Sequence, residues 1–441
     1  MNQMSFLKKL VIVSLFYIPI LSIADNIKFK SIDENYVALD DSGKIWVWGR
    51  HMDVIALGYD YNYKNFLKAE PINTKNLEFK KVFSDDEITC GNTIDNDTYC
   101  WGGDNHMILG APKHKKSLIP VKMPISFTQI TSSDGLLYSI SDKTICALDL
   151  SGQAWCWGMG KIGQLGNGEK FSPDTNLTMV NYTNFIQSVP KKVKMPKNIK
   201  FIEIAGGKDD SRARFVALDS NGNIWQWGAT GSRDANGNGI FFEYPTKRKA
   251  PKGVKFTKLF DSRYLLDSSG NIWELEVAGD INNSFHKKTF VNQKVETKEN
   301  NCLITTTGEL WCTYNERKPN YFKVNLPGKA KQLALREATP VGCVLSSDGK
   351  INCFYPKTKQ SVKLAEFDIP KNLKFKTIIT GYSPDYCALS NDGDVWCWCK
   401  FGDNSCFGDS NADEKEVLTN IQKEHPYIKP REITKVKIQK V

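Results

Sequence analysis

The sequence contains few of the features on which enzymes and metal sites depend. Its 441 residues include only five histidines, which are scattered without metal-ligand spacing: His51, His106, His114, His286 and His425. No GxSxG, HExxH or phosphate-binding loop occurs. Helical periodicity is nowhere persuasive, and after residue 24 no apolar run is long enough to cross a membrane. These absences indicate an all-β chain in which no cofactor, metal or catalytic residue is expected.

What the sequence does contain is a repeated pattern, seen most clearly as CALSNDGDVWCW at residues 387–398. Eight copies can be aligned, and they start at Val37, Cys90, Cys146, Val216, Tyr264, Cys302, Cys343 and Cys387. Neighbouring copies start 38 to 70 residues apart. A period of this length is typical of propellers, solenoids and arrays.

The seventh position of each copy predicts a tight hairpin turn. It is Gly in seven copies and Asn96 in the second. Gly and Asn adopt positive φ most readily, and a three-residue loop made of a type I turn and a left-handed third residue requires this. With Asn391–Asp392–Gly393 as the loop, Ala388 lies opposite Trp396 and Cys387 lies opposite Cys397.

Ten of the twelve cysteines fall at this facing position. Residues opposite each other on antiparallel strands have Cα atoms about 4.5 to 5.5 Å apart, which suits a disulfide. The predicted disulfides join Cys90 to Cys100, Cys146 to Cys156, Cys302 to Cys312, Cys343 to Cys353 and Cys387 to Cys397. Cys399 and Cys406 remain and could close the loop after the last copy. A zinc site formed by Cys397, Cys399 and Cys406 is a weaker alternative to this disulfide, because an isolated CxC motif lacks a second zinc knuckle.

Each hairpin is apolar on both faces. Leu389 and Val395 share a face with the cysteine pair, whereas Trp396 and Trp398 project from the other face. Such a hairpin fits a four-stranded blade stacked between two like blades. Short alternating strands precede most hairpins: Ile27–Ile32, Leu77–Phe83, Phe127–Thr131, Ile199–Ala205, Val254–Phe260, Lys331–Leu335 and Leu373–Thr380. A last strand, Ile433–Val441, could pair with the first and close a ring.

Residues 1–24 have the pattern of a secretory signal peptide. Lys8 and Lys9 precede an apolar run, and Ser22–Ile23–Ala24 offers small residues before a cut. An uncleaved anchor is the alternative. The mature chain would be the single domain 25–441, without a transmembrane segment. Cysteines in hairpin register independently favour an oxidising compartment, so a secreted or periplasmic location is expected.

The chain is basic, with 59 Lys and Arg against 49 Asp and Glu. Without Lys8 and Lys9 the mature chain would carry a net charge of +8. The densest lysine groups, at 113–116, 191–197 and 247–258, lie between hairpins. They lack interleaved aromatic residues, so solvated outer strands are a simpler interpretation than an anionic polymer or membrane site, and no specific nucleic acid is expected.

Three hairpins are followed by a Gly-rich tail, and the run from Trp157 to Gly168 (WGMGKIGQLGNG) is the most complete. Together with Trp48–Gly49 and Trp227–Gly228, this ALDxxGxxWxWG…GQLGxG pattern resembles the regulator of chromosome condensation repeat. The resemblance implies a β-propeller, which has seven blades in most of the family. Eight hairpins are present here, however, and the last four lack the full tail, so both seven and eight four-stranded blades remain possible.

The resemblance implies a binding or regulatory function. The eukaryotic founder of the family is a guanine-nucleotide exchange factor for the small GTPase Ran and binds chromatin, and some bacterial members act on that GTPase in host cells. Other exported members are similar to pure binders that cover a partner protein with one face of the ring. No stretch of this chain matches a catalytic wedge residue by residue.

We therefore expect an exported, non-enzymatic protein that holds a protein or a cell-envelope polymer on one rim. Two other classes remain: a regulator of a host GTPase, and a hydrolase or lyase with a rim active site. The expected contact residues follow the hairpins directly: Arg50, His51, Asp104, Asn105, His106, Lys161, Arg233, Lys400 and Asp403.

A calcium loop near Asp234 is a weaker hypothesis. The run from Asp234 to Gly239 places oxygen donors at alternate positions with Gly sixth, as the first half of such a loop does. The twelfth position is Pro245 instead of a bidentate Glu. A Gly/Asn-rich turn on the rim is the simpler interpretation.

Overall fold

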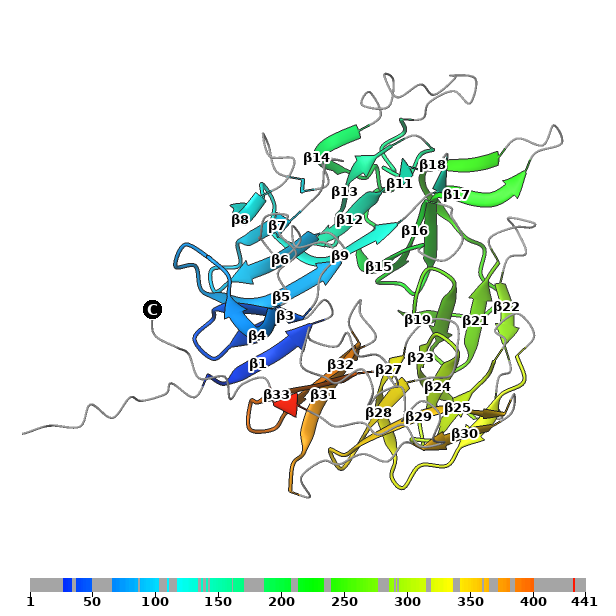
Figure 1. Cartoon of the computed structure of the whole chain (residues 1–441). Coiled ribbons are helices and arrows are strands. Elements are labelled where there is room, and N and C mark those ends of the chain that lie inside the picture. The colour runs from blue at the N-terminus through cyan, green and yellow to red at the C-terminus, as the bar shows by residue number, and fades with distance from the viewer. Residues whose placement is uncertain are drawn as a thin grey trace, which may run out of the picture.

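The computed structural model shows an all-β ring of eight blades (Figure 1). The residues that it describes are 27–33, 37–49, 66–85, 88–102, 109–110, 117–133, 136–137, 140–141, 143–160, 162–169, 186–207, 213–233, 239–276, 285–288, 291, 293–314, 319–335, 342–358, 361–364, 372–380, 385–399 and 431–432. No helix occurs among them. The hairpin count, and not the usual family number of seven, therefore gives the number of blades.

The first four blades each form an antiparallel four-stranded sheet, and a small extra hairpin lies between the first two strands of blade 3. Blade 1 comprises β1 (Phe29–Asp33), β2 (Val37–Asp40), β3 (Ile45–Gly49) and β4 (Phe66–Pro71). Blade 2 comprises β5 (Phe79–Asp85), β6 (Ile88–Thr93), β7 (Thr98–Gly102) and β8 (Ser117–Lys122). Blade 3 comprises β9 (Phe127–Ser133), β12 (Thr144–Asp149), β13 (Ala154–Met159) and β14 (Ile186–Lys192), with β10 (Leu136–Leu137) and β11 (Ile140–Ser141) as the extra hairpin. Blade 4 comprises β15 (Phe201–Gly206), β16 (Arg214–Asp219), β17 (Ile224–Arg233) and β18 (Gly239–Lys247).

The last four blades repeat this order. Blade 5 comprises β19 (Phe256–Leu259), β20 (Tyr264–Asp267), β21 (Ile272–Leu275) and β22 (Phe285–Lys288). Blade 6 comprises β23 (Val295–Glu299), β24 (Cys302–Thr305), β25 (Leu310–Cys312) and β26 (Phe322–Val324). Blade 7 comprises β27 (Ala330–Leu335), β28 (Gly342–Ser346), β29 (Ile351–Thr358) and β30 (Ser361–Leu364). Blade 8 comprises β31 (Phe375–Thr380), β32 (Asp385–Ser390), β33 (Val395–Cys399) and β34 (Arg431–Glu432).

The predicted turn and register are confirmed. The seventh residue of every copy has a positive φ, between 78° and 84° for the glycines and 68° for Asn96. In blade 8, Leu389 pairs with Val395 and Cys387 with Cys397. The three-residue turn therefore sets the pairing of the two strands that flank it.

The five predicted hairpin disulfides are present. They join Cys90 to Cys100, Cys146 to Cys156, Cys302 to Cys312, Cys343 to Cys353 and Cys387 to Cys397. Their Cα atoms are 3.9 to 4.1 Å apart, slightly below the expected range and nearer to the close, non-hydrogen-bonded type of facing pair. All ten cysteines are buried, including Cys100 and Cys353, so these sulfur atoms belong to the core and not to a rim site.

The sixth predicted pair cannot be placed in the same way. The side chain of Cys399 and the position of Cys406 lie outside the described residues. A disulfide between them therefore stays a prediction. Cys397, the third member of the competing zinc hypothesis, is bonded to Cys387, so that hypothesis is wrong.

Blades stack by placing the disulfide face of one blade against the Ala/Trp face of the next. Cys146 and Cys156 of blade 3, for example, share a core with Trp225 and Trp227 of blade 4. The same relationship joins blade 2 to blade 3 and blade 7 to blade 8. Between blades 6 and 7, Val344 and Phe354 take the place of the Ala and Trp residues. The hairpin is thus buried on both sides, as its two apolar faces predict.

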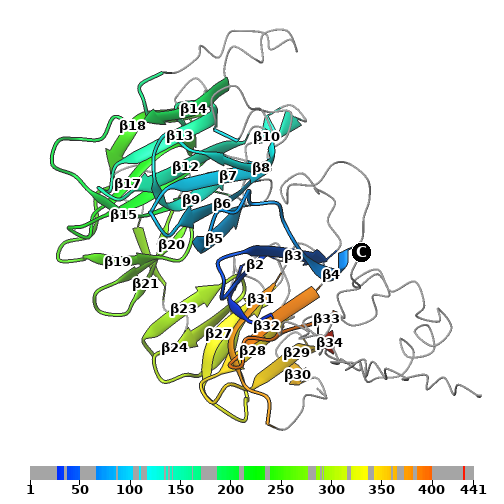
Figure 2. The ribbon, with the colours of Figure 1, turned by 90° about the vertical axis from the view of Figure 1, so that its left-hand side faces the viewer.

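The ring closes through a contact between blades 8 and 1, which lie side by side in both views (Figures 1 and 2). The N–H of Phe29 donates to the carbonyl of Gly393 at 2.8 Å, and Lys28 Nζ lies 2.7 Å from Asp394 Oδ1. Each blade consists of strands that are consecutive along the chain, so closure in the described residues needs no shared strand. Ile433–Val441, the strand expected to close the ring, lies outside the described residues.

Several predicted inner strands begin two residues too early. Ile199, for example, continues the apolar alternation, but it lies in the segment that crosses from one blade to the next, where its N–H bonds to Pro196 O at 3.4 Å. The alternation reflects packing of this crossing segment onto the core, not strand pairing. The inner strand of blade 6, Val295–Glu299, was missed because charged residues interrupt its apolar pattern.

Candidate functional site: the loop face and the central channel

The two ends of the ring differ in the kind of connection they carry. At one end lie the eight tight hairpin turns and the segments that lead into the inner strands; we call this the turn face. At the other end lie the connections after the first and third strands of each blade, which we call the loop face. The expected contact residues follow the third strands in the sequence, so the loop face is where they are expected.

Most of those expected residues fall outside the described ranges, namely Arg50, His51, Asp104, Asn105, His106, Lys161, Lys400 and Asp403. Arg233 is the last residue of β17, where it pairs with Gly239 at the start of β18. The calcium-loop candidate at Asp234 lies between these strands, again outside the described residues. The grouping of these residues on one rim therefore stays a prediction.

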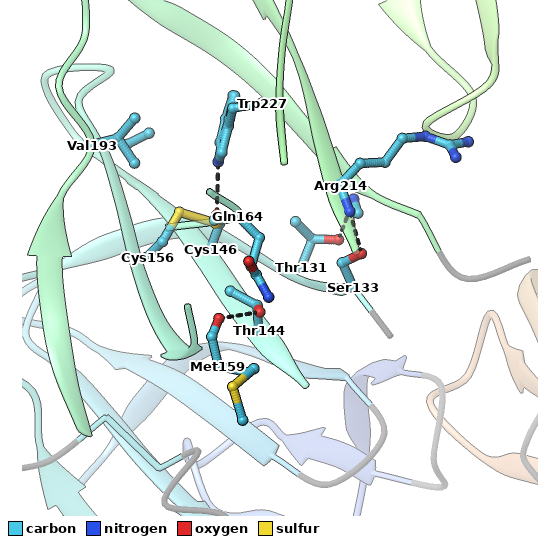
Figure 3. The surroundings of a disulfide bond; sticks show 12 residues. Thr131, Ser133, Thr144, Cys146, Cys156, Met159, Gln164, Val193, Arg214 and Trp227 are labelled. Carbon is cyan, nitrogen blue, oxygen red and sulfur yellow. Dashed lines mark hydrogen bonds between the residues drawn. A yellow bond between two sulfur atoms is a disulfide. The ribbon is translucent and has the colours of Figure 1, made fainter. Parts of the chain in front are cut away.

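The Gly-rich tail of blade 3 is described, and its contacts are structural. Gln164 lies in the tail and is almost fully buried. Its carbonyl accepts the indole N–H of Trp227 from blade 4 at 3.0 Å (Figure 3). Its side-chain oxygen accepts the N–H of Ile162 at 2.6 Å. A Cβ on Gly166 would come within 3.0 Å of the Trp227 ring. The tail thus covers the tryptophan of the following blade.

Blade 2 repeats this arrangement. A Cβ on Gly110 would lie 2.7 Å from the indole nitrogen of Trp157, and Leu109 is buried in the same core. Blade 5 has Leu275 where blade 4 has Trp227, so the tail of blade 4 has no indole to cover. The Gly-rich tail, which identifies the repeat, therefore packs one blade against the next.

The central channel holds a pocket of about 300 Å³ between the inner strands of blades 5 to 8. Lys258, Glu296 and Lys331 contribute charged groups to its lining. Two further lining residues are used to join blades: Glu299 accepts the N–H of Leu335, and Gln332 both donates to and accepts from the backbone of Ile378. Much of the polar lining therefore holds the ring together.

Aspartates at the start of three turns have lowered pKa values. Burial raises the pKa of Asp219, but hydrogen bonds from Asn223, Trp225 and the turn N–H groups outweigh that effect. Asp149 and Asp267 make equivalent bonds to Trp155 and Trp273, and their pKa values are lowered for the same reason. A carboxylate held ionised by donors in a turn is a structural group, not an acid or base poised for catalysis.

Blade 5 replaces its disulfide with a polar pair. Tyr264 faces Glu274, whose carboxylate forms ion pairs with Arg263 and Lys288. Burial raises the pKa of Glu274, but these two cations more than offset it and leave the pKa lowered. Lys298 of blade 6 lies over the Tyr264 ring, 3.9 Å from its centroid. The ion pairs therefore lie within blade 5, and the Lys298–Tyr264 contact with blade 6 adds to an apolar cluster of Tyr264, Ile272, Val295 and Leu303.

No cluster of three or more His, Cys, Asp or Glu suited to a metal occurs within the described ranges. His286 is the histidine that the structure describes, and it lies on β22 with Nε2 2.6 Å from Glu276. No helix in the described part of the chain is long and apolar enough to span a membrane.

Comparison with known proteins supports the resemblance inferred from the repeats. The family profile described as regulator of chromosome condensation (RCC1) repeat matches residues 151–211. The chain is 25% identical over 201 residues to the ultraviolet-B receptor UVR8 of Arabidopsis thaliana, covering 44% of this chain and 39% of UVR8. It is 23% identical over 318 residues to the mitochondrial RCC1 domain-containing protein RUG3 of the same plant, covering 65% and 64%.

Solved structures of similar topology include Prp20p of Saccharomyces cerevisiae, with 18% identity, a TM-score of 0.40 and coverage of 83% of this chain and 69% of Prp20p. Human WBSCR16 has 13% identity, a TM-score of 0.46 and coverage of 81% and 89%. The chain spans less than two thirds of the curated relatives UVR8 and RUG3. It thus carries an RCC1 repeat and is similar to RCC1-like proteins, with eight blades in the ring.

Proposed function

We propose that this protein is a non-enzymatic binding protein that acts in an oxidising compartment and holds a protein partner on its loop face. One observation carries the proposal: most of the buried polar groups described in the ring, and the sulfur atoms of the five disulfides, join strands and blades. The five disulfides, the turn aspartates and the Gly-rich tail all have structural partners. What remains variable is the set of connections between strands, and binding residues are commonly placed on such loops.

The disulfides also indicate where the protein acts. Five cross-strand disulfides are stable in an oxidising environment and are rare where glutathione keeps thiols reduced. Export through a signal peptide at residues 1–24 would deliver the chain to such a compartment. A cell-envelope protein is therefore the first partner class to test.

Regulation of a small GTPase is the second candidate, and the RCC1 repeat favours it. Prp20p, the yeast RCC1 protein, binds Gsp1p and histones. A cytosolic GTPase would meet this protein in a reducing environment, where the disulfides are not maintained. This candidate therefore requires delivery to a cytosol and a fold that tolerates reduction.

The experiment is an affinity capture with oxidised 25–441 as bait, against both envelope fractions and a host-cell lysate. The rim variant combines Arg50→Ala, His51→Ala, Asp104→Ala and His106→Ala. Its matched control combines Lys191→Ala, Lys287→Ala and Lys323→Ala, which lie on outer strands. We expect an envelope protein that binds the wild type and the control and is lost with the rim variant.

Two outcomes would overturn the proposal. One is capture that the rim variant and its control retain equally, because the loop face would then not be the binding surface. The other is accelerated GDP release from a recovered GTPase at catalytic amounts of the protein, which would establish exchange activity and the second candidate.

A further inference from the structure

The turn face carries a lysine at a fixed point of the repeat. The residue just before the inner strand is Lys in six of the eight blades: Lys28, Lys200, Lys255, Lys294, Lys329 and Lys374. The stem of this lysine packs on the turn glycine of the preceding blade. A Cβ on Gly270, for example, would lie 3.1 Å from the Cβ of Lys294. The fold therefore distributes cations around one end of the ring, at the junctions between blades.

The lysines are densest across blades 3 to 5, where the crossing segments from outer to inner strands add more. We call the following exposed residues the basic sector: Lys194, Lys197, Lys200, Lys249, Lys252 and Lys255. Two turn carboxylates of these blades are withdrawn from the surface, and the exposed Glu169 of blade 3 is paired with Lys191. Asp219 and Asp267 are buried under their turns, and Glu203 accepts the N–H of Leu259 at 2.6 Å. The outward charge of the sector is positive.

Three exposed aliphatic side chains lie at or next to this face, with Ile202 at the rim of the central channel, because Glu296 and Lys331 at the same repeat position line its pocket. Ile94 is 60%, Leu150 72% and Ile202 53% exposed, and they belong to blades 2, 3 and 4 in succession. Ile94 and Leu150 occupy the first position of the hairpin turn, which in blade 4 is Ser220. Ile202 is the residue at which β15 bulges, since the register shifts between Phe201 and Glu203. Neither position requires an apolar side chain for the fold.

We propose that the turn face docks on an anionic lipid membrane. The basic sector would lie against the headgroups, and Leu150 and Ile202 would enter the boundary between headgroups and acyl chains. Lysines near an anionic bilayer are attracted to it, and partial insertion of aliphatic side chains adds apolar burial. A hydrated polysaccharide would also attract the lysines but would leave these aliphatic chains in water. The combination therefore favours a membrane.

This surface lies at the opposite end of the ring from the proposed partner site. A ring docked through its turn face would present the loop face away from the bilayer. The inference does not depend on the identity of a partner, because vesicle binding and partner capture use different residues and different readouts.

The test is co-sedimentation of oxidised 25–441 with vesicles of phosphatidylcholine alone or mixed with phosphatidylglycerol. We expect binding only to the mixed vesicles, weakened by salt. The triple variant Lys200→Gln, Lys252→Gln and Lys255→Gln should lower the affinity about a hundredfold, since each lysine near an anionic surface is worth roughly a factor of five. The charge-matched control Lys191→Gln, Lys287→Gln and Lys323→Gln should bind nearly as the wild type does.

The double variant Leu150→Ser and Ile202→Ser separates a membrane from a soluble polyanion. We expect it to bind mixed vesicles at least about tenfold more weakly while it is retained on a sulfated polysaccharide column as the wild type is. Thermal unfolding of every variant checks that the ring is intact. The proposal is wrong if the folded wild type does not bind mixed vesicles. It is also wrong if the control loses as much vesicle affinity as the lysine variant, or if the aliphatic variant binds vesicles as tightly as the wild type. Column retention without vesicle binding would assign the sector to a polysaccharide.

Discussion

The backbone N–H of Phe201 lies 2.9 Å from the carbonyl oxygen of Gly152, which joins the inner strand of blade 4 to the turn of blade 3. The same bond, from the first inner-strand residue to the preceding turn residue, recurs at other junctions and closes the ring between Phe29 and Gly393. Blade 2 has Asn96 in its turn, and there the N–H of Phe127 bonds to the hydroxyl of Thr98 instead, at 2.8 Å. The turn glycine therefore has two roles: its positive φ forms its own hairpin turn, and its carbonyl accepts a hydrogen bond from the next blade.

This double role gives a prediction for Gly152. An alanine at this position would have to adopt a positive φ of 81°. Its Cβ would also lie 2.7 Å from the carbonyl oxygen of Phe201. Gly253 has a φ of 80° and nothing within 4 Å of such a Cβ, so Gly253→Ala measures the backbone cost alone. We expect Gly253→Ala to lower the free energy of unfolding by about 1 to 2 kcal/mol. Gly152→Ala should cost more, by at least about 1 kcal/mol. Equal losses in denaturant titrations would show that the junction adjusts freely.

Much of the fold follows from local chemistry that the sequence states directly. The turn glycines set the hairpin register, and the register places Cys100 opposite Cys90 and Cys353 opposite Cys343, as in the other three disulfides. The apolar residues on both hairpin faces then predicted stacked blades. Because each step is local, eight copies could be counted without knowledge of the whole ring.

The contacts between blades could not be inferred in this way. The hydrogen bond between Gln164 and Trp227 joins residues far apart in the sequence. From the sequence alone, the Gly-rich tail that contains Gln164 fits a functional loop as well as a segment that packs over an indole. The basic sector could not be inferred either, because Lys197 and Lys252 lie in separate groups that only the crossing segments bring to one face. These lysines were expected on solvated outer strands. The structure places them instead in the segments that cross from an outer strand to the inner strand of the next blade.

The buried indole of Trp157 gives the second prediction. The side chain is fully buried and stacks on Phe127, with ring centroids 5.7 Å apart, beneath Gly110 of the preceding blade. Trp157→Ala removes this large side chain from a junction between blades, and we expect it to lower the free energy of unfolding by about 3 to 5 kcal/mol. Trp155→Ala is the control, since Trp155 lies on the same strand but is only half-buried. Thermal unfolding should show a clearly larger fall for Trp157→Ala, and similar falls would mean that the cover over Trp157 is loose.

The turn aspartates give the last prediction, which concerns acid stability. Because hydrogen bonds in the folded state lower the pKa of Asp219, the unfolded chain takes up its proton at a higher pH than the folded ring does. The stabilisation is therefore fully present above the ordinary aspartate pKa of about 3.9 and is lost as pH falls through the lower, folded value. Asp149 and Asp267 act in the same direction. These three carboxylates should leave the denaturant midpoint unchanged from pH 7 down to about pH 4. Below that pH they should lower the midpoint.

The variant Asp219→Asn isolates one of these carboxylates. It should be less stable than the wild type at neutral pH, because its amide cannot replace a carboxylate that accepts from Asn223, Trp225 and the turn. It should also lose less stability on acidification, so that the two curves converge at low pH. Parallel curves would show that Asp219 does not titrate with folding, and the acid sensitivity would then belong to other carboxylates.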